Sequence, residues 1–261
     1  TKVDNGIHNA SEWLGRPVPE VYSAELSEFV FAAGVKILKE WSPDVMYLST
    51  TDYIQHKFAP HQQGAKDFYA MTDKYIGELD AMGVALVVTA DHGMKPKHDT
   101  NGEPSVVYVQ DLLDQWLGQG SARVILPITD PYVVHHGALG SFATAYLPED
   151  VDRNEIISKL SNTDGILLVI DKAAAVQRFD LPTDRIGDIV MISTENMTLG
   201  TSVDRHDLEA LKEPLRSHGG LTEQEVPFIV NRKINLPGAP ELRNFDAFFY
   251  ASIAANTRNV N

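Results

Sequence analysis

Residues 85–94 have the sequence Ala85-Leu86-Val87-Val88-Thr89-Ala90-Asp91-His92-Gly93-Met94. The apolar part of this stretch, rich in β-branched residues, is typical of a strand that is buried on both faces of a parallel sheet. Asp91 and His92 would then lie at its carboxyl end, the edge where open α/β sheets bind ligands. A carboxylate beside an imidazole suits a zinc-like ion. The same pair also occurs where Asp caps a turn and His packs against the sheet edge, so this stretch alone leaves both roles open.

The composition limits the class of protein. The chain has 261 residues, of which 43% are hydrophobic and 22% charged, as in ordinary globular proteins. Its formal net charge of -14 argues against nucleic acid or an anionic membrane as a partner, although a small anionic substrate remains compatible. It has no cysteine, so any metal must be held by His and carboxylates, as in catalytic zinc sites. With no signal peptide and no apolar run of membrane-spanning length, we expect a cytoplasmic protein.

Helical and strand-like patterns alternate upstream of residue 85. Apolar residues at helical spacing predict one helix over residues 20–40 and another over residues 64–82, with Gly83 at the C-terminal end of the second. Residues 45–49 between them are a candidate strand. This alternation is typical of right-handed βαβ units, and it predicts an α/β fold with a mostly parallel sheet flanked by helices.

Residues 103–204 break this regular alternation. We interpret them as an inserted α+β cap subdomain, so that the core consists of residues 1–102 and 205–261; a continuation of the main sheet is the alternative. The expected strands are residues 123–126, 141–147, 166–170 and 186–192, and the expected helices are residues 109–116 and 152–160. After the cap, residues 226–231 predict a strand and residues 244–254 a closing helix.

Two further patterns carry possible metal ligands. Asp52 and His56 follow the candidate strand at 45–49, and if a helix begins there, their i,i+4 spacing puts both side chains on one face. His218 precedes Gly219 and Gly220, where the backbone can approach a ligand closely. Each pattern alone is weak, but the three ligand patterns, each after a strand or beside glycine, together indicate a metal site.

Three segments carry a family resemblance: Thr51–Lys57, Thr89–Met94 and Ser217–Gly220. They resemble the alkaline phosphatase superfamily in its nucleotide pyrophosphatase/phosphodiesterase branch. The wider sequence, including Tyr22–Leu26 and Asp130–Gly137, is most similar to the phosphonoacetate hydrolases. The resemblance extends over essentially the whole chain and implies an alkaline phosphatase-like fold.

The resemblance implies two zinc ions about 4 Å apart. Asp52, His56 and His218 would hold one ion, and Asp91 and His92 would help to hold the other. The family completes the second site with another Asp and a nucleophilic Thr or Ser, both N-terminal to this region, and this sequence has no match for either. We therefore expect the chain to be the C-terminal portion of a longer enzyme, with the N-terminal part of the fold absent from it.

The implied reaction is cleavage of the C–P bond of phosphonoacetate, a small anionic phosphonate, to acetate and phosphate through a phospho-threonine intermediate. The lysines that hold the substrate carboxylate in the family also lie upstream. Arg123 is a candidate substrate contact from the cap, and a solvated surface arginine is the alternative. Lys95, Lys97 and His98 could line the site, although a solvated loop is the favoured interpretation, and His135 and His136 are expected to be structural.

Other functions and assemblies remain open. A zinc-dependent phosphodiesterase or nucleotide pyrophosphatase would use the same zinc pair, with Tyr53, Phe58 and Tyr132 as candidates for a base platform. If the native polypeptide starts at Thr1, a catalytically incomplete metal-binding domain becomes the stronger alternative. The sequence does not decide whether the protein forms a homodimer.

Overall fold

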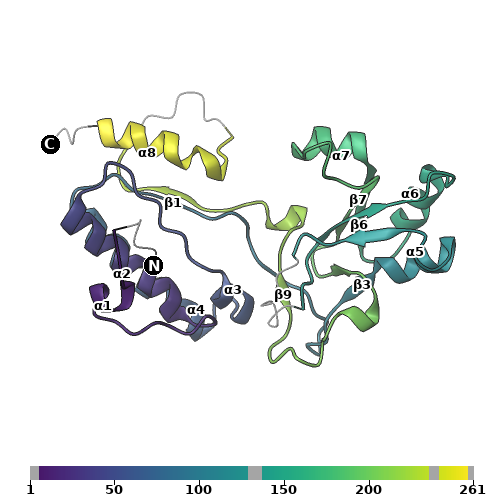
Figure 1. The fold of residues 1–261 in the computed structure, drawn as a ribbon, viewed down its shortest axis with the longest axis horizontal. Helices are drawn as coiled ribbons and strands as arrows, with labels where there is room; N and C mark the ends of the chain where they lie inside the picture. The colour runs from purple at the N-terminus through teal and green to yellow at the C-terminus, as the bar shows by residue number, and fades with distance from the viewer. Residues whose placement is uncertain (1–5, 129–136, 235–240, 258–261) are drawn as a thin grey trace. The chain divides into compact units, whose positions relative to one another are not determined.

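The computed structural model describes residues 6–128, 137–234 and 241–257. They belong to two compact units (Figure 1), one made of residues 1–91 and 227–261 and the other of residues 92–226. The second unit is therefore an insertion in the sequence of the first. Both units combine helices and strands, as the predicted α/β class requires. The predicted cap boundaries at residues 103 and 204 remain a prediction.

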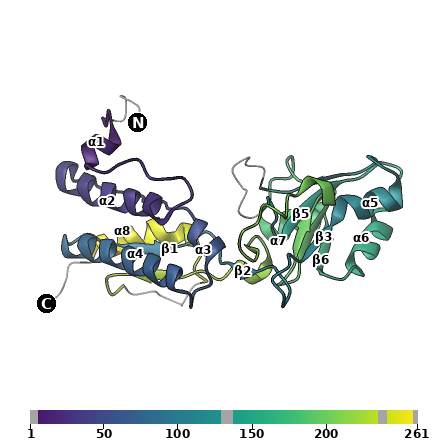
Figure 2. The ribbon, with the colours of Figure 1, turned by 90° about the horizontal axis from the view of Figure 1, so that it is seen from below.

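The first unit is built on two long helices. Its elements are α1 (Ala10–Leu14), α2 (Ala24–Trp41), α3 (Tyr53–Lys57), α4 (Gln63–Ala81), β1 (Val87–Thr89), β10 (Phe228–Val230), the 3-10 turn η4 (Asn244–Asp246) and α8 (Ala247–Asn256). Figures 1 and 2 show α2 and α4 side by side, and Figure 1 shows α8 on the opposite side of β1. The helices predicted at residues 20–40 and 64–82 are confirmed as α2 and α4, and Gly83 follows α4 with a positive φ of 80°.

The strand predicted at residues 45–49 is wrong. The segment alternates as a strand would, because Met46 and Leu48 pack on the small core of Val35, Tyr75 and Leu79. A strand also needs a neighbour for its backbone hydrogen bonds, and no part of the chain that the structure describes forms a strand with this segment. Its outward side chains, including Val45 at 72%, are strongly exposed.

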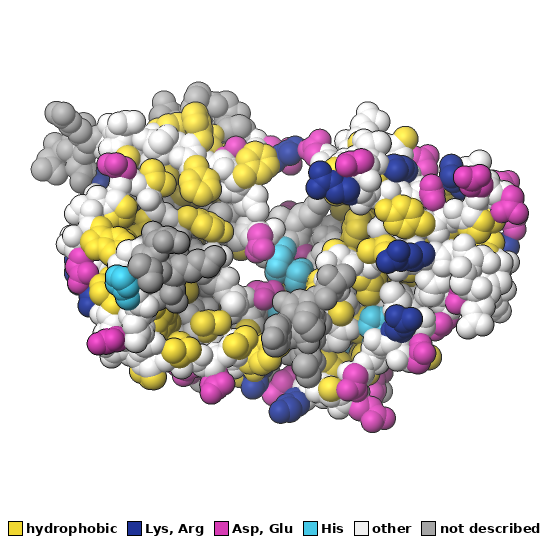
Figure 3. All heavy atoms as spheres, viewed as in Figure 1, with side chains coloured by type: hydrophobic (Ala, Val, Ile, Leu, Met, Phe, Trp, Pro, Cys, Tyr) yellow, Lys and Arg dark blue, Asp and Glu magenta, His cyan; other side chains and the backbone are white. Residues whose placement is uncertain are grey.

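Apolar side chains remain at the surface of the first unit. Figure 3 shows them in yellow over this unit, and the exposed ones include Tyr47, Ile229, Phe248 and Phe249. The β1–β10 pair is antiparallel, with Val88 opposite Ile229, and every residue of β1 is only half-buried. The apolar run at residues 85–90 is thus a strand as predicted, but within the described residues it is not buried on both faces.

The second unit contains a four-stranded antiparallel sheet. Its elements are β2 (Lys95–Pro96), β3 (Val106–Tyr108), α5 (Val109–Leu117), β4 (Arg123–Ile125), β5 (Phe142–Tyr146), α6 (Arg153–Ser161), β6 (Ile166–Asp171), α7 (Lys172–Phe179), β7 (Ile189–Ser193), β8 (Thr198–Gly200), η2 (Val203–Arg205), β9 (Arg216–Ser217) and η3 (Leu221–Glu223). The sheet order is β4-β5-β7-β6, and the pairs β2–β9 and β3–β8 lie outside it.

Both faces of this sheet are covered by helices. Ile189 and Met191 of β7 pack with Leu113 of α5 and Leu160 of α6 in the main core. Val190, which points to the other face, packs in the cluster that α7 covers. Successive residues of a strand point to opposite faces of the sheet. The strand β7 is therefore fully buried because helices cover both faces.

Strand pairing differs from the expected mostly parallel sheet. Among the described strands, β3 and β8 pair in parallel and the other pairs are antiparallel. The β5–α6–β6 connection has the order of a βαβ unit, but β7 lies between its two strands and runs antiparallel to both. Element order alone could not reveal this because it does not specify which strands become neighbours.

Candidate metal site

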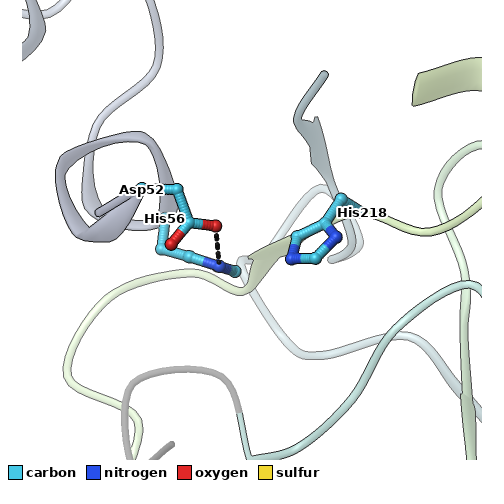
Figure 4. Close-up of side chains that lie close together, drawn as sticks. All are labelled: Asp52, His56 and His218. Atoms are coloured by element: carbon cyan, nitrogen blue, oxygen red, sulfur yellow. Dashed lines mark ion pairs between the residues drawn. The ribbon is translucent and has the colours of Figure 1, made fainter. Parts of the chain in front are cut away.

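Asp52 lies at the start of a short helix, and His56 lies in its last turn. The predicted turn of helix is present as α3, with Asp52 at its N-cap position and His56 one turn further on. Oδ2 of Asp52 and Nε2 of His56 are 3.0 Å apart, and Figure 4 marks this ion pair with a dashed line. The His56 side chain is 2% exposed and that of Asp52 40%. The predicted i,i+4 juxtaposition is therefore confirmed, and it brings a carboxylate and an imidazole together.

Asp91 and His92 follow β1, as predicted, and His92 begins the second unit. Nδ1 of His92 lies 2.9 Å from the backbone oxygen of Gly93. A carbonyl oxygen can only accept a hydrogen bond, so Nδ1 carries a proton in this contact. Histidines that ligate metals typically donate a hydrogen bond to a backbone carbonyl in this way, which orients the imidazole ring.

His218 lies directly after β9, which pairs with β2 so that Ser217 is opposite Lys95. This pairing brings the segments after His92 and before His218 into one antiparallel ribbon. The two imidazole rings stack with their centroids 3.5 Å apart and their planes 6° from parallel. The backbone oxygen of His218 accepts a hydrogen bond of 2.8 Å from the Ser141 N–H. Within the second unit, the structure thus brings together two of the predicted ligands; Figure 4 labels His218.

The interpretation of Lys97 as part of a solvated loop is wrong. Its side chain is 0% exposed and forms an ion pair of 3.1 Å with Glu223, whose side chain is 1% exposed. Its neighbour Lys95 fits the expectation better, because it pairs with Glu195 at the surface. Glu223 was not singled out by the sequence, although a Glu three residues after a glycine that opens a turn is a recognisable local signal.

The remaining candidates have different surroundings. Arg123 lies in β4 with an exposed side chain, opposite Tyr146, so its role in substrate binding remains a prediction. Tyr132, His135 and His136 lie outside the described residues. His206, which no sequence pattern supported, is buried and accepts a hydrogen bond from the Thr201 N–H through Nε2.

The family model for type I phosphodiesterase / nucleotide pyrophosphatase matches residues 3–221. Two solved structures of phosphonoacetate hydrolase from Sinorhizobium meliloti 1021, one in complex with phosphonoformate and one with phosphonoacetate, are each 70% identical to this chain over 96% of its length, with TM-scores of 0.92 and 0.91. The predicted resemblance is thereby confirmed, as is the α/β fold that it implied.

The chain spans 61% of the length of those two solved chains. Murine ectonucleotide pyrophosphatase / phosphodiesterase 5 is more distant, with 18% identity over 81% of this chain and 53% of that chain, and a TM-score of 0.53. This second likeness concerns the fold alone. None of the described helices is long and apolar enough to cross a membrane.

Proposed function

Because this chain belongs to the type I phosphodiesterase / nucleotide pyrophosphatase family, we propose that it is the metal-binding part of a hydrolase that cleaves phosphonoacetate. The reaction adds water across the C–P bond and yields acetate and phosphate. The observation that carries the proposal is the 70% identity, over 96% of the chain, to a phosphonoacetate hydrolase that was solved with phosphonoacetate.

The proposed cofactor is a pair of zinc ions. Asp52, His56 and His218 would hold one ion, to which they offer one carboxylate oxygen and two imidazole nitrogens. Asp91 and His92 would contribute to the other. This donor set fits zinc, which accepts His and carboxylate ligands and, in catalytic sites, leaves a position for substrate. When bound, zinc supplies positive charge that stabilises a phosphoryl group under attack and favours ionisation of a nearby hydroxyl.

The chain's own residues would orient these groups. The hydrogen bond from Nδ1 of His92 to the Gly93 carbonyl would orient its imidazole ring, and the hydrogen bond from the Ser141 N–H to the His218 carbonyl would hold the backbone of His218. We propose that a Thr preceding residue 1 is the nucleophile that forms the phospho-threonine intermediate. Arg123 is our candidate for a contact with the substrate carboxylate, since a guanidinium pairs well with a planar carboxylate.

Metal binding by this chain is the first test. Zinc content after dialysis should fall in Asp52→Ala, His56→Ala and His218→Ala relative to the unaltered chain, because each change removes a ligand. His61→Ala is the matched control, since His61 is an exposed histidine of the same unit as His56 and has no proposed role. Equal zinc content in all five proteins would contradict the proposed ligands.

Turnover is the second test. It is measured on the polypeptide that contains this chain and any residues that precede Thr1. Phosphate release from phosphonoacetate is compared with hydrolysis of a phosphodiester and a phosphomonoester, with and without chelator. Chelator-sensitive release from phosphonoacetate alone would support the proposal. Chelator-sensitive diester cleavage instead would favour the phosphodiesterase, and zinc binding without any turnover would favour a catalytically incomplete metal-binding domain.

A further inference from the structure

Lys97 and Glu223 are buried charges without a role in the proposed chemistry. Nζ of Lys97 and Oε1 of Glu223 are 3.1 Å apart, and both side chains lie almost wholly out of contact with solvent. Burial lowers the pKa of Lys97, and the neighbouring Glu223 carboxylate partly offsets this effect. Taking two charges out of water is costly, and an apolar pair of similar volume is often as stable. The pair therefore calls for an explanation other than stability.

Glu223 connects the two histidine segments of the second unit. Its Oε2 accepts a hydrogen bond of 2.7 Å from the N–H of Gly220, two residues after His218. Its backbone oxygen accepts one of 2.6 Å from the N–H of Gly93, the residue after His92. One residue thus fixes the backbone next to both of the proposed ligands.

Lys97 holds Glu223 from the other side. Besides the ion pair, its Nζ donates a hydrogen bond to the backbone oxygen of Glu195. Its backbone N–H donates to the oxygen of Leu215, which continues the antiparallel pairing of β2 with β9. The strand β9 leads directly into His218. The Lys97 side chain is therefore anchored in the same β2–β9 ribbon that ends at this histidine.

The two glycines permit this close approach. A Cβ at Gly220 would lie 2.8 Å from Oε2 of Glu223 and 2.9 Å from Cβ of Ser141, closer than such atoms normally come. A Cβ at Gly93 would lie 3.2 Å from the backbone oxygen of Glu223. The carboxylate therefore reaches the Gly220 N–H because no side chain stands between them.

We propose that the Lys97–Glu223 pair is a positioning device that fixes the imidazoles of His92 and His218 for metal binding. It deepens the proposed function and rests on it, because it requires these histidines to be ligands. The carboxylate gives the loop after His218 a fixed acceptor, and the Lys97 ammonium balances its buried charge and holds it in place, which a neutral acceptor such as Gln would not require. Partners of this kind typically alter metal affinity by about 10–100-fold when removed.

The test compares two double variants of this chain that differ in whether the side chain at position 223 can accept a hydrogen bond. K97M/E223Q and K97M/E223M both remove the two buried charges and keep similar side-chain lengths, but only Gln can accept the Gly220 hydrogen bond. Co²⁺ serves as the probe, since its visible absorption reports the ligand geometry as well as the affinity. We expect K97M/E223Q to bind Co²⁺ within ~3-fold of the unaltered chain, and K97M/E223M to bind it about 10–100-fold more weakly with an altered spectrum.

Circular dichroism establishes that each variant is folded. If K97M/E223M does not fold, G220A replaces it, because the added Cβ displaces the Glu223 carboxylate while both charges remain; we expect about 10-fold weaker Co²⁺ binding. Equal affinity and spectra in the two folded double variants, or an unchanged affinity in folded G220A, would overturn the inference.

His218→Ala separates the failure of this inference from the failure of the proposed function. If the unaltered chain binds no Co²⁺, or binds it no better than His218→Ala does, then the proposed ligands are wrong and the inference fails with them. If His218→Ala weakens binding while the two double variants bind alike, the ligands stand and only the positioning role is refuted.

Discussion

Replacing Leu160 by Ala should strongly destabilise the second unit. Leu160 lies in α6, is 0% exposed and belongs to the main core of this unit. The substitution removes three carbon atoms, which at about 0.8 kcal/mol each amounts to about 2.4 kcal/mol of lost transfer free energy. The cavity left in a closely packed core adds to this, so we expect a decrease in the free energy of unfolding of about 3–4 kcal/mol. Leu167→Ala in β6 is the matched control, since Leu167 is 51% exposed.

Urea unfolding followed by the fluorescence of Trp116 measures the loss of unfolding free energy in the second unit itself. Trp116 packs against the same core, whereas Trp13 and Trp41 lie in the first unit with their ring centroids 6.1 Å apart. A background with Trp13→Phe and Trp41→Phe therefore makes the second unit the source of the signal. With a urea dependence of about 2 kcal/mol per molar, Leu160→Ala should lower the midpoint by about 1.5–2 M.

The control should behave differently. Leu167→Ala leaves no closed cavity and removes a side chain that is already half in water, so we expect a cost of less than about 1 kcal/mol. A cost below about 1 kcal/mol for Leu160→Ala, or an equal cost for both variants, would refute the placement of α6 on this core.

Two further changes test the backbone and a half-buried carboxylate. Gly187→Ala would place a Cβ 2.5 Å from a backbone carbonyl oxygen of β5, so it should cost about 1–3 kcal/mol in the same urea experiment, and no loss of stability would contradict the close approach of Gly187 to β5. Burial raises the pKa of the Glu28 carboxyl, but hydrogen bonds from Arg16 and Tyr75 outweigh burial and hold that pKa below its usual value. The stabilisation by this carboxylate is therefore present above its unfolded-state pKa and is lost as the pH falls through its folded-state pKa. The difference in unfolding free energy between the unaltered chain and Glu28→Gln should accordingly narrow from neutral pH to about pH 3. A difference that stays constant over this range would contradict the lowered pKa.

Elements with long, regular patterns could be predicted from the sequence. The helices α2 and α4 were predicted within a few residues because many apolar positions repeat at helical spacing. The helix α7 was missed, since its Lys172–Phe179 segment is short and rich in alanine, although Asp171 before it caps the helix by accepting the Ala174 N–H. Strands of two or three residues, such as β2 and β9, have too few positions for any periodicity to appear.

The pairing of strands could not be predicted by the same means. Periodicity describes how one segment distributes apolar side chains, and it does so correctly at residues 45–49, where Met46 and Leu48 face the core. Whether such a segment becomes a strand depends on a hydrogen-bonding neighbour, which lies elsewhere in the chain. The position of β7 between β5 and β6 also depends on distant parts of the chain, because three segments of similar composition could be arranged in more than one order.

In the candidate site, too, features set by local spacing could be predicted and features set by distant contacts could not. Asp52 and His56 were found from their spacing, since one turn of helix is enough to bring their side chains within 3.0 Å. Lys97 was expected to be solvated because a lysine is rarely fully buried unless it is paired, and its partner Glu223 is 126 positions away. Local spacing can therefore indicate which side chains are candidate metal ligands. The accuracy with which they are held depends on contacts such as Gly220 to Glu223 and Glu223 to Lys97, where a backbone amide, a carboxylate and an ammonium group support one another only in the folded chain.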